Sequence, residues 1–194
     1  MPSANKKLVA YGLGVLLLLL GRMAIPADLR AVEVERDDDR YSLRSEAYFA
    51  AKPKDVYRVL TDYDLFEQFS SAYVEARNVA GDDEGRPRFF TRMQGCVLLF
   101  CRSFVRRGYL LLTPHSEIVA VAEPEGSDFK YSRERWRLRG EGSGTLLIYD
   151  SQIKPEFWVP PVIGPYAIKR SLRENSVDAI DRIEALALGR TPKP

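Results

Sequence analysis

AAKPKDVYRVLTDYDLFEQFSS (residues 50–71) and PEFWVPPVIGPYAIKRSLRENSVDAIDRIEALA (residues 155–187) are the two stretches that decide the fold of this 194-residue chain. Pro53 is a favourable first residue for a helix in the first stretch, and a second short helix is expected to follow it. In the second stretch, apolar residues recur every three or four positions, which predicts one long helix over 166–188. The sequence thus predicts two short helices near the start of the domain and one long helix at its end.

The segments before and between these stretches alternate between apolar and polar residues, as half-buried strands do. Clusters of Gly, Pro and Asp separate them, and no helical segment joins neighbouring strands, so an antiparallel meander is favoured. We predict an α+β, helix-grip architecture: a curved antiparallel sheet of about seven strands wraps around the C-terminal helix, with two short helices after the first strand. The predicted strands cover approximately 41–49, 73–79, 88–95, 100–113, 117–123, 129–140 and 145–154.

The N-terminal residues have the pattern of an export signal. Lys6 and Lys7 precede the apolar stretch 8–20, and a small residue ends the segment 25–27. At about 1.5 Å per residue the apolar stretch reaches about 20 Å, short of the roughly 30 Å hydrocarbon core. We therefore expect a periplasmic or secreted protein. The alternative, which Arg22 favours, is an uncleaved segment that holds the domain at the inner membrane.

The predicted organisation is a signal peptide or anchor at 1–27, a charged tether at 28–40, one domain at 41–188 and a short tail at 189–194. The whole chain has 29 basic and 27 acidic residues. Three of the basic residues and none of the acidic residues lie in the leader, so the remainder carries a formal charge of −1. This near-neutral charge gives no electrostatic footprint for nucleic acid.

Residues that carry common catalytic chemistry are scarce. His115 is the one histidine, and it follows Pro114 in an expected turn, where we expect a surface residue. Asp62 lies at a helix start, where an aspartate usually caps. There is no nucleophile elbow, no metal-spaced cluster and no glycine-rich phosphate loop. We therefore expect no metal and no cofactor.

Three segments together resemble the START-like superfamily of helix-grip proteins, and in particular its polyketide-cyclase and coenzyme Q-binding branch. These segments are AAKPKDVYRVLTDYD at 50–64, YSRERWRLRGEGSGTLLIYD at 131–150 and FWVPP at 157–161. The resemblance covers about 41–188. It implies a deep apolar cavity under the terminal helix that accepts a lipid, isoprenoid, sterol or polyketide-like molecule. Many such proteins bind or carry a ligand and catalyse nothing.

The expected strand 129–140 carries the most informative candidates. Strict alternation places Ser132, Glu134, Trp136 and Leu138 on one face and a row of arginines on the other, solvated face. Trp136 fits the core better than a ligand contact, although both stay open. An unpaired Glu134 in an apolar interior would be costly, so we expect it to pair with an arginine, to lie at the cavity mouth or to contact the ligand, in that order.

Phe157 and Trp158 belong to a stiff apolar connection before the final helix. Such a segment either closes the cavity floor as ordinary core or is exposed for membrane contact or ligand entry. We expect contact with a hydrophobic small molecule or lipid, contact with a membrane surface as a further option, and a monomer. The candidate ligand-binding residues are Phe104, Glu134, Trp136, Leu138, Tyr149, Phe157, Trp158, Leu172 and Ser176.

Cys96 and Cys101 flank the apolar sequence VLLF at 97–100. In one straight strand their backbones would lie about 16 Å apart, beyond the roughly 7 Å limit for a disulfide. A bridge therefore requires a turn, and export would permit oxidation. We expect the disulfide, with two independently buried thiols as the alternative. If it forms, VLLF becomes a candidate membrane-touching tip.

Three functions follow from this sequence. The first is an exported domain that binds a hydrophobic ligand without covalent chemistry. The second is a cyclase-type enzyme in which Glu134 or Tyr149 assists proton transfer in a dry pocket. The third is a cell-envelope interaction domain whose cavity is filled by its own side chains.

Overall fold

The computed structural model describes residues 27–97, 100–159, 166, 169–170 and 179–192. Its strands form one antiparallel sheet in the order β1-β2-β8-β7-β6-β5-β4-β3. The strands are β1 (Asp28–Asp37), β2 (Arg40–Phe49), β3 (Tyr73–Val79), β4 (Arg88–Val97), β5 (Phe100–Thr113), β6 (Glu117–Ala122), β7 (Phe129–Glu141) and β8 (Gly144–Pro155).

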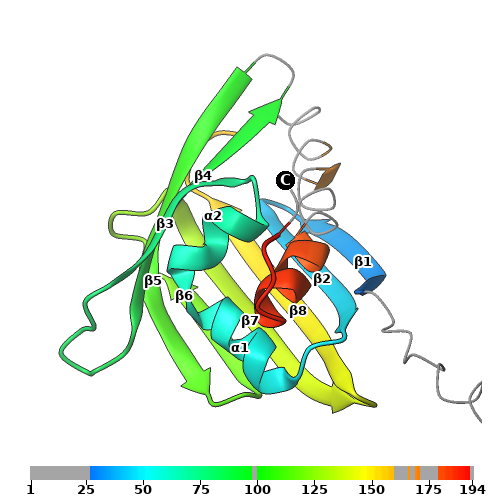
Figure 1. Cartoon of the computed structure of the whole chain (residues 1–194). Helices are drawn as coiled ribbons and strands as arrows, with labels where there is room; N and C mark the ends of the chain where they lie inside the picture. The colour runs from blue at the N-terminus through cyan, green and yellow to red at the C-terminus, as the bar shows by residue number, and fades with distance from the viewer. Residues whose placement is uncertain (1–26, 98–99, 160–165, 167–168, 171–178, 193–194) are drawn as a thin grey trace, which may run out of the picture.

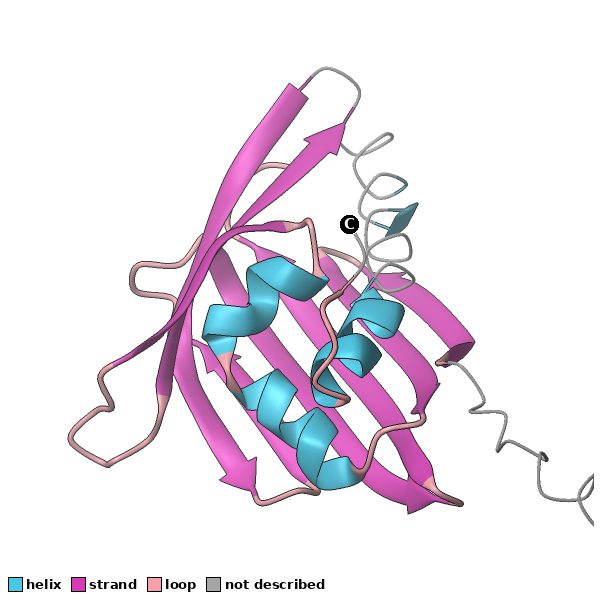
Figure 2. Ribbon diagram, viewed as in Figure 1, coloured by secondary structure: helices cyan, strands magenta, loops and turns pink. Residues whose placement is uncertain are grey.

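All described helical segments lie on one face of this sheet, as Figure 1 shows. They are α1 (Pro53–Thr61), the 3-10 turn η1 (Tyr63–Leu65), α2 (Phe66–Phe69) and the C-terminal helical residues 166, 169–170 and 179–187. Figure 2 shows the same two layers, with the curved sheet behind the helices. The predicted α+β arrangement of a curved antiparallel sheet with few helices is confirmed, while the sheet has eight strands rather than seven.

The additional strand is β1, in the segment that we expected to be a tether. Leu29, Val32 and Val34 are half-buried, and the charged residues between them face solvent. A register shift between Leu29 and Ala31 interrupts the alternation, so two consecutive residues turn the same way. Because of its many charged residues and this register shift, the sequence of this segment does not show the regular alternation of a strand. The segment 28–37 pairs with β2 and forms the outer edge of the sheet.

The early helices form as the sequence predicts. Pro53 occupies the first turn of α1, and Val56, Val59 and Leu60 form its buried side. Asp62 caps η1 because its carboxylate accepts a hydrogen bond from the backbone N–H of Asp64 at 3.2 Å. These helices therefore present an apolar surface to the sheet.

The C-terminal helix ends against α1. Gly189 has a φ of +69°, and its N–H donates to the Leu186 carbonyl while the Arg190 N–H donates to the Ala185 carbonyl, which is a Schellman termination. The Glu184 carboxylate accepts the backbone N–H of Ala50 at 2.6 Å. The end of this helix is thus fixed beside the start of α1. The predicted helix positions 167–168 and 171–178 lie outside the described residues.

Tight turns join the middle strands into the expected meander. Gly142 has a φ of +57° in the β7–β8 hairpin, a conformation that favours glycine. At Gly108 in β5, an added Cβ would lie 1.9 Å from the carbonyl oxygen of Val121. Strands β5 and β6 could not approach this closely with any other residue. In the part of the chain that the structure describes, no helix is long and apolar enough to cross a membrane; the leader lies outside that part.

Candidate functional site

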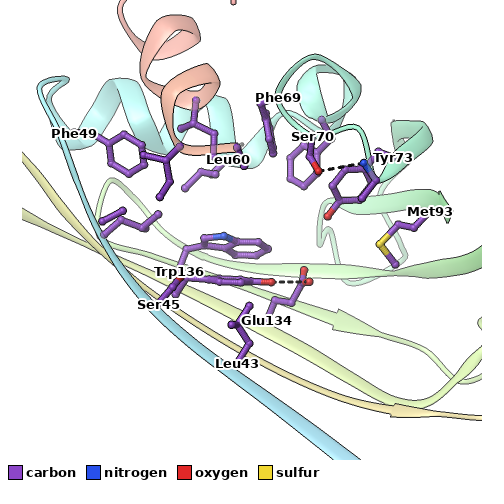
Figure 3. A pocket seen from close by; sticks show the side chains of 18 residues that line it. Leu43, Ser45, Phe49, Leu60, Phe69, Ser70, Tyr73, Met93, Glu134 and Trp136 are labelled. Carbon is purple, nitrogen blue, oxygen red and sulfur yellow. Dashed lines mark hydrogen bonds between the residues drawn. The ribbon is translucent and has the colours of Figure 1, made fainter. Parts of the chain in front are cut away.

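A cavity of about 170 Å³ lies between the inner face of the sheet and the helices. Apolar side chains make up most of its wall, and polar groups gather near Glu134 and Tyr73, as Figure 3 shows. Phe49 and Leu60 lie away from this polar end in the same view. The lining residues are Leu43, Ser45, Ala47, Phe49, Leu60, Phe66, Phe69, Ser70, Ala72, Tyr73, Met93, Glu134, Trp136, Leu147, Tyr149, Ala179, Ile180 and Ile183.

The polar end is built on a buried ion pair between β5 and β7. Arg106 donates from Nη1 to Glu134 Oε1 at 3.0 Å, and its Nη2 lies 2.9 Å from Glu134 Oε2. The two side chains are 2% and 7% exposed. This two-point geometry suits the fork of a guanidinium and offsets part of the cost of burying both charges. Of the three environments that the sequence allows for Glu134, the first, pairing with an arginine, is therefore confirmed.

Tyr149 extends this pair into the cavity. Its hydroxyl donates to Glu134 Oε1 at 2.9 Å, and its ring stacks on Trp136 with centroids 5.2 Å apart. Burial and then the negative charge of Glu134 raise the pKa of Tyr149 well above its ordinary value. The hydroxyl is consequently held in its protonated, donating form.

Tyr73 adds a second phenol to the polar end. Burial and the nearby Glu134 charge raise its pKa, while Arg106 opposes this shift. Burial lowers the pKa of Arg106, but the Glu134 carboxylate outweighs it, so the pKa of the guanidinium is raised overall. A ligand in the cavity therefore meets one carboxylate with spare acceptor capacity and protonated tyrosine hydroxyls.

Three of the candidate ligand-binding residues line this cavity: Glu134, Trp136 and Tyr149. Leu138 is 4% exposed in the core next to them, but it does not line the cavity. Leu172 and Ser176 lie outside the described residues. The remaining candidates are Phe104, Phe157 and Trp158.

Phe104 and Phe157 form a separate aromatic cluster. Their rings stack with centroids 4.7 Å apart, and Phe129 lies 6.2 Å from each. The guanidinium of Arg102 covers the Phe157 ring at 4.6 Å. Trp158, the next residue, is 77% exposed. These rings do not line the cavity, because Phe157 packs on β5 and Trp158 extends into solvent.

Sequence reasoning missed Arg106 and the polar lining residues Tyr73, Ser45 and Ser70. It also missed the apolar lining residues of α1, α2, β2, β4, β8 and the C-terminal helix. A signal for Arg106 was present. From Phe104 to Leu110 in β5, alternate residues point inward, and Arg106 is the one charged residue among them, as Glu134 is between Ser132 and Leu138 in β7.

The two cysteines are cross-strand neighbours in the backbone register of β4 and β5. The backbone ladder pairs Cys96 with Cys101, and Cys101 is disulfide-bonded. The antiparallel pairing of β4 and β5 brings residues 96 and 101 side by side, which is the geometry that a bridge requires. The predicted VLLF tip at 97–100 contains Leu98 and Leu99, which lie outside the described residues. His115 is exposed in its turn, with a φ of +60° and its ring against that of Tyr57.

A family model described as polyketide cyclase / dehydrase and lipid transport matches residues 49–171, well over half of the chain. The chain belongs to this family. A comparison with curated protein sequences finds no match. The family membership confirms the START-like resemblance that the sequence shows, and the family description covers both cyclases and lipid transport.

Solved structures of the same fold include proteins with different described roles. TTHA0849 from Thermus thermophilus aligns with a TM-score of 0.60 and 18% identity over 76% of this chain and 97% of that chain. Human STARD10 aligns with a TM-score of 0.60 and 15% identity, over 84% of this chain and 73% of the STARD10 chain. The Zhui aromatase/cyclase from Streptomyces sp. R1128 aligns with a TM-score of 0.59 and 14% identity, over 77% of this chain and 94% of the Zhui chain. At sequence identities of 14–18%, these structural similarities establish the fold of this chain and not its function.

Proposed function

We propose that this domain binds a single hydrophobic molecule in the cavity between sheet and helices and carries it without covalent chemistry. The observation that carries the proposal is the cavity itself: about 170 Å³, mostly apolar, with polar groups at one end. Apolar walls with a few placed polar groups are typical of small-molecule sites. The family description, which includes lipid transport, supports the same class of ligand.

The size and polarity of the cavity narrow the ligand. Drug-sized ligand sites occupy about 300–1,000 Å³, so this space suits one ring or a short apolar chain. Glu134 can accept a further hydrogen bond, and the protonated Tyr73 hydroxyl can donate one. The Tyr149 hydroxyl already donates to Glu134 and can accept a hydrogen bond from the ligand. A molecule with a hydroxyl or carbonyl at one end of an apolar body, such as a quinone or isoprenoid, fits both features.

Export and membrane contact belong to the same proposal. The basic and apolar pattern of residues 1–27 supports a periplasmic or secreted protein, or one held at the inner membrane by an uncleaved leader, and we propose that it acts as a monomer. Trp158 at 77% exposure is the best candidate for touching a membrane, because tryptophan favours the interface between lipid and water. A domain placed beside a membrane could take up ligands that water dissolves poorly.

The test is native mass spectrometry of the exported protein, followed by organic extraction and identification of any bound molecule. Ala179 lines the cavity, whereas Ala185 on the same helix does not. We expect Ala179→Phe to reduce bound ligand by at least about tenfold and Ala185→Phe to leave it unchanged. A protein without bound ligand that also takes up none of a panel of lipids, quinones and polyketides would overturn the proposal and favour an interaction domain.

A cyclase-type reaction is the second candidate. The specific observation in its favour is that Glu134 and Tyr149, a carboxylate and a phenol 2.9 Å apart, line the same cavity. If the domain is such an enzyme, Glu134→Gln should abolish turnover of a polyketide-like substrate while binding persists. For a carrier, the ligand should still bind and no substrate should be consumed by either protein.

A further inference from the structure

A second hollow, of about 300 Å³, lies on the opposite face of the sheet, over β3, β4 and β5. Phe89 packs in the hydrophobic core, and successive residues of a strand point to opposite faces, so Phe90 points outward. The residues that line this hollow are Arg77, Val79, Arg88, Phe89, Phe90 and Arg107. The hollow is therefore separate from the ligand cavity.

Register places two of the arginines on either side of the Phe90 ring. Arg77 on β3 and Arg107 on β5 are both direct cross-strand partners of Phe90. Their guanidinium carbons lie 4.2 Å and 5.3 Å from the ring centroid, and that of Arg92 lies 5.9 Å away. Although it faces outward, Phe90 is only 4% exposed. Cation–π contacts thus hold several guanidinium groups around one platform.

The charges around this platform do not cancel. Glu75 pairs with both Arg77 and Arg92, and Glu123 pairs with Arg88. Among the described residues, Arg107 has no carboxylate within ion-pair distance. Four guanidinium groups therefore meet two carboxylates. The surplus of two positive charges equals the charge of a phosphate monoester dianion.

We propose that this arginine hollow binds a phosphate monoester, either free in solution or as the headgroup of a lipid. Guanidinium groups match phosphate oxygens with paired N–H donors, which makes arginine well suited to this recognition. By the same measure of volume one water molecule requires about 10–15 Å³, so the hollow has room for the phosphate and part of its ester. The proposal does not depend on what the inner cavity binds.

The experiment measures binding of two phosphate sources to the full chain at constant ionic strength. Inorganic phosphate is titrated by calorimetry, and phosphatidylcholine vesicles with and without phosphatidic acid are used in a flotation assay. Arg107→Ala is the test variant. Arg139→Ala is the matched control, because Arg139 is an exposed arginine at the far end of β7 and its removal changes the net charge equally. Arg107→Lys keeps the charge but loses the planar fork.

We expect Arg107→Ala to weaken binding by at least about tenfold, the factor for a lost charge-assisted hydrogen bond, with Arg139→Ala unchanged and Arg107→Lys between them. This pattern with inorganic phosphate indicates a free phosphate ligand, and the same pattern with vesicles alone indicates a lipid headgroup. Circular dichroism establishes whether each variant is folded. If Arg107→Ala does not fold, the weaker binding expected of Arg107→Lys tests the proposal in its place. Absence of binding in both arms, or equal loss in Arg139→Ala, would overturn the proposal.

Discussion

The substitution Glu134→Gln tests the assignment of the buried ion pair most directly. Glutamine has nearly the shape of glutamate, so packing around residue 134 is retained and only the negative charge is removed. Arg106 would then keep its positive charge at 2% exposure with no carboxylate partner. Loss of Glu134 removes the charge that raises the pKa of Arg106, but a guanidinium stays protonated near neutral pH even when it is buried, so Arg106 cannot escape this cost by losing its proton.

The magnitude follows from burial. Removing one partner of a buried ion pair costs about 3–5 kcal/mol of unfolding free energy, because an uncompensated charge remains in the interior. For a domain of this size, 1 kcal/mol corresponds to about 2–4 °C, so the melting temperature should fall by roughly 6–20 °C. Replacing both partners with apolar residues, as in Arg106→Met with Glu134→Leu, should recover at least about 2 kcal/mol of this loss.

Urea unfolding followed by circular dichroism measures these differences. The control is Glu117→Gln, which breaks the half-exposed pair between Glu117 and Arg135 and should cost less than about 1 kcal/mol. The reasoning is refuted if Glu134→Gln costs no more than this control. It is also refuted if the apolar double variant is less stable than Glu134→Gln, because the charge left on Arg106 could not then explain the loss.

Three further predictions concern other parts of the molecule. Burial, and then the charge of Glu134, raise the pKa of Tyr149 above its ordinary 10.0, so its contribution to stability is complete below pH 10 and is lost as pH rises beyond it. Urea midpoints should fall above pH 10, and less steeply in Tyr149→Phe; an unchanged slope would contradict this. Replacing Cys96 and Cys101 with serine should lower the free energy of unfolding by about 2 kcal/mol, the loop-closure value for so short a loop. Equal urea midpoints with and without reductant in the unsubstituted protein would argue against the bridge. A chain that begins at residue 40 lacks β1 and exposes the edge of β2, so size-exclusion chromatography should show aggregates, and a stable monomer would show that β1 is dispensable.

Most of the sheet could be predicted because its strands have one buried face. The segments 73–79 and 100–113 are strands with the predicted bounds, and the other predicted strands differ by only a few residues at their ends. Turns at 81–87 and 141–144 contain residues that tolerate positive φ, which separates the strands clearly. Period and turn chemistry therefore agree along most of the domain.

Edge position explains why β1 could not be predicted. The strand has only one neighbour, and its apolar residues are half-buried rather than buried. Exposed edge strands commonly carry many charges, which discourage pairing with other chains. Composition then resembles that of a linker. Only the pairing of 28–37 with β2 reveals the strand, and pairing is a property of the fold rather than of the segment.

The candidate site was predicted in part for a related reason. Alternation predicts which face a side chain occupies, and it correctly placed Glu134 and Trp136 toward the interior. It does not predict that Arg106 on β5 meets Glu134 on β7, because β6 separates the two strands in the sheet. Phe157 and Trp158 follow the last strand, where no period constrains them. The position of Phe157 depends on packing against Phe104 of β5, and the next residue, Trp158, is exposed; the local sequence encodes neither.

The geometry at the polar end bears on the choice between carrier and enzyme. A general acid or base must exchange a proton, yet both oxygens of Glu134 already contact Arg106, and one of them also accepts from Tyr149. The raised pKa of Tyr149 opposes its use as a base near neutral pH. Such a fixed ion pair is better suited to orienting the polar end of a ligand than to moving protons. Proton transfer through Glu134 would leave the buried Arg106 charge without its partner, which costs about 3–5 kcal/mol, and a carrier has no such requirement.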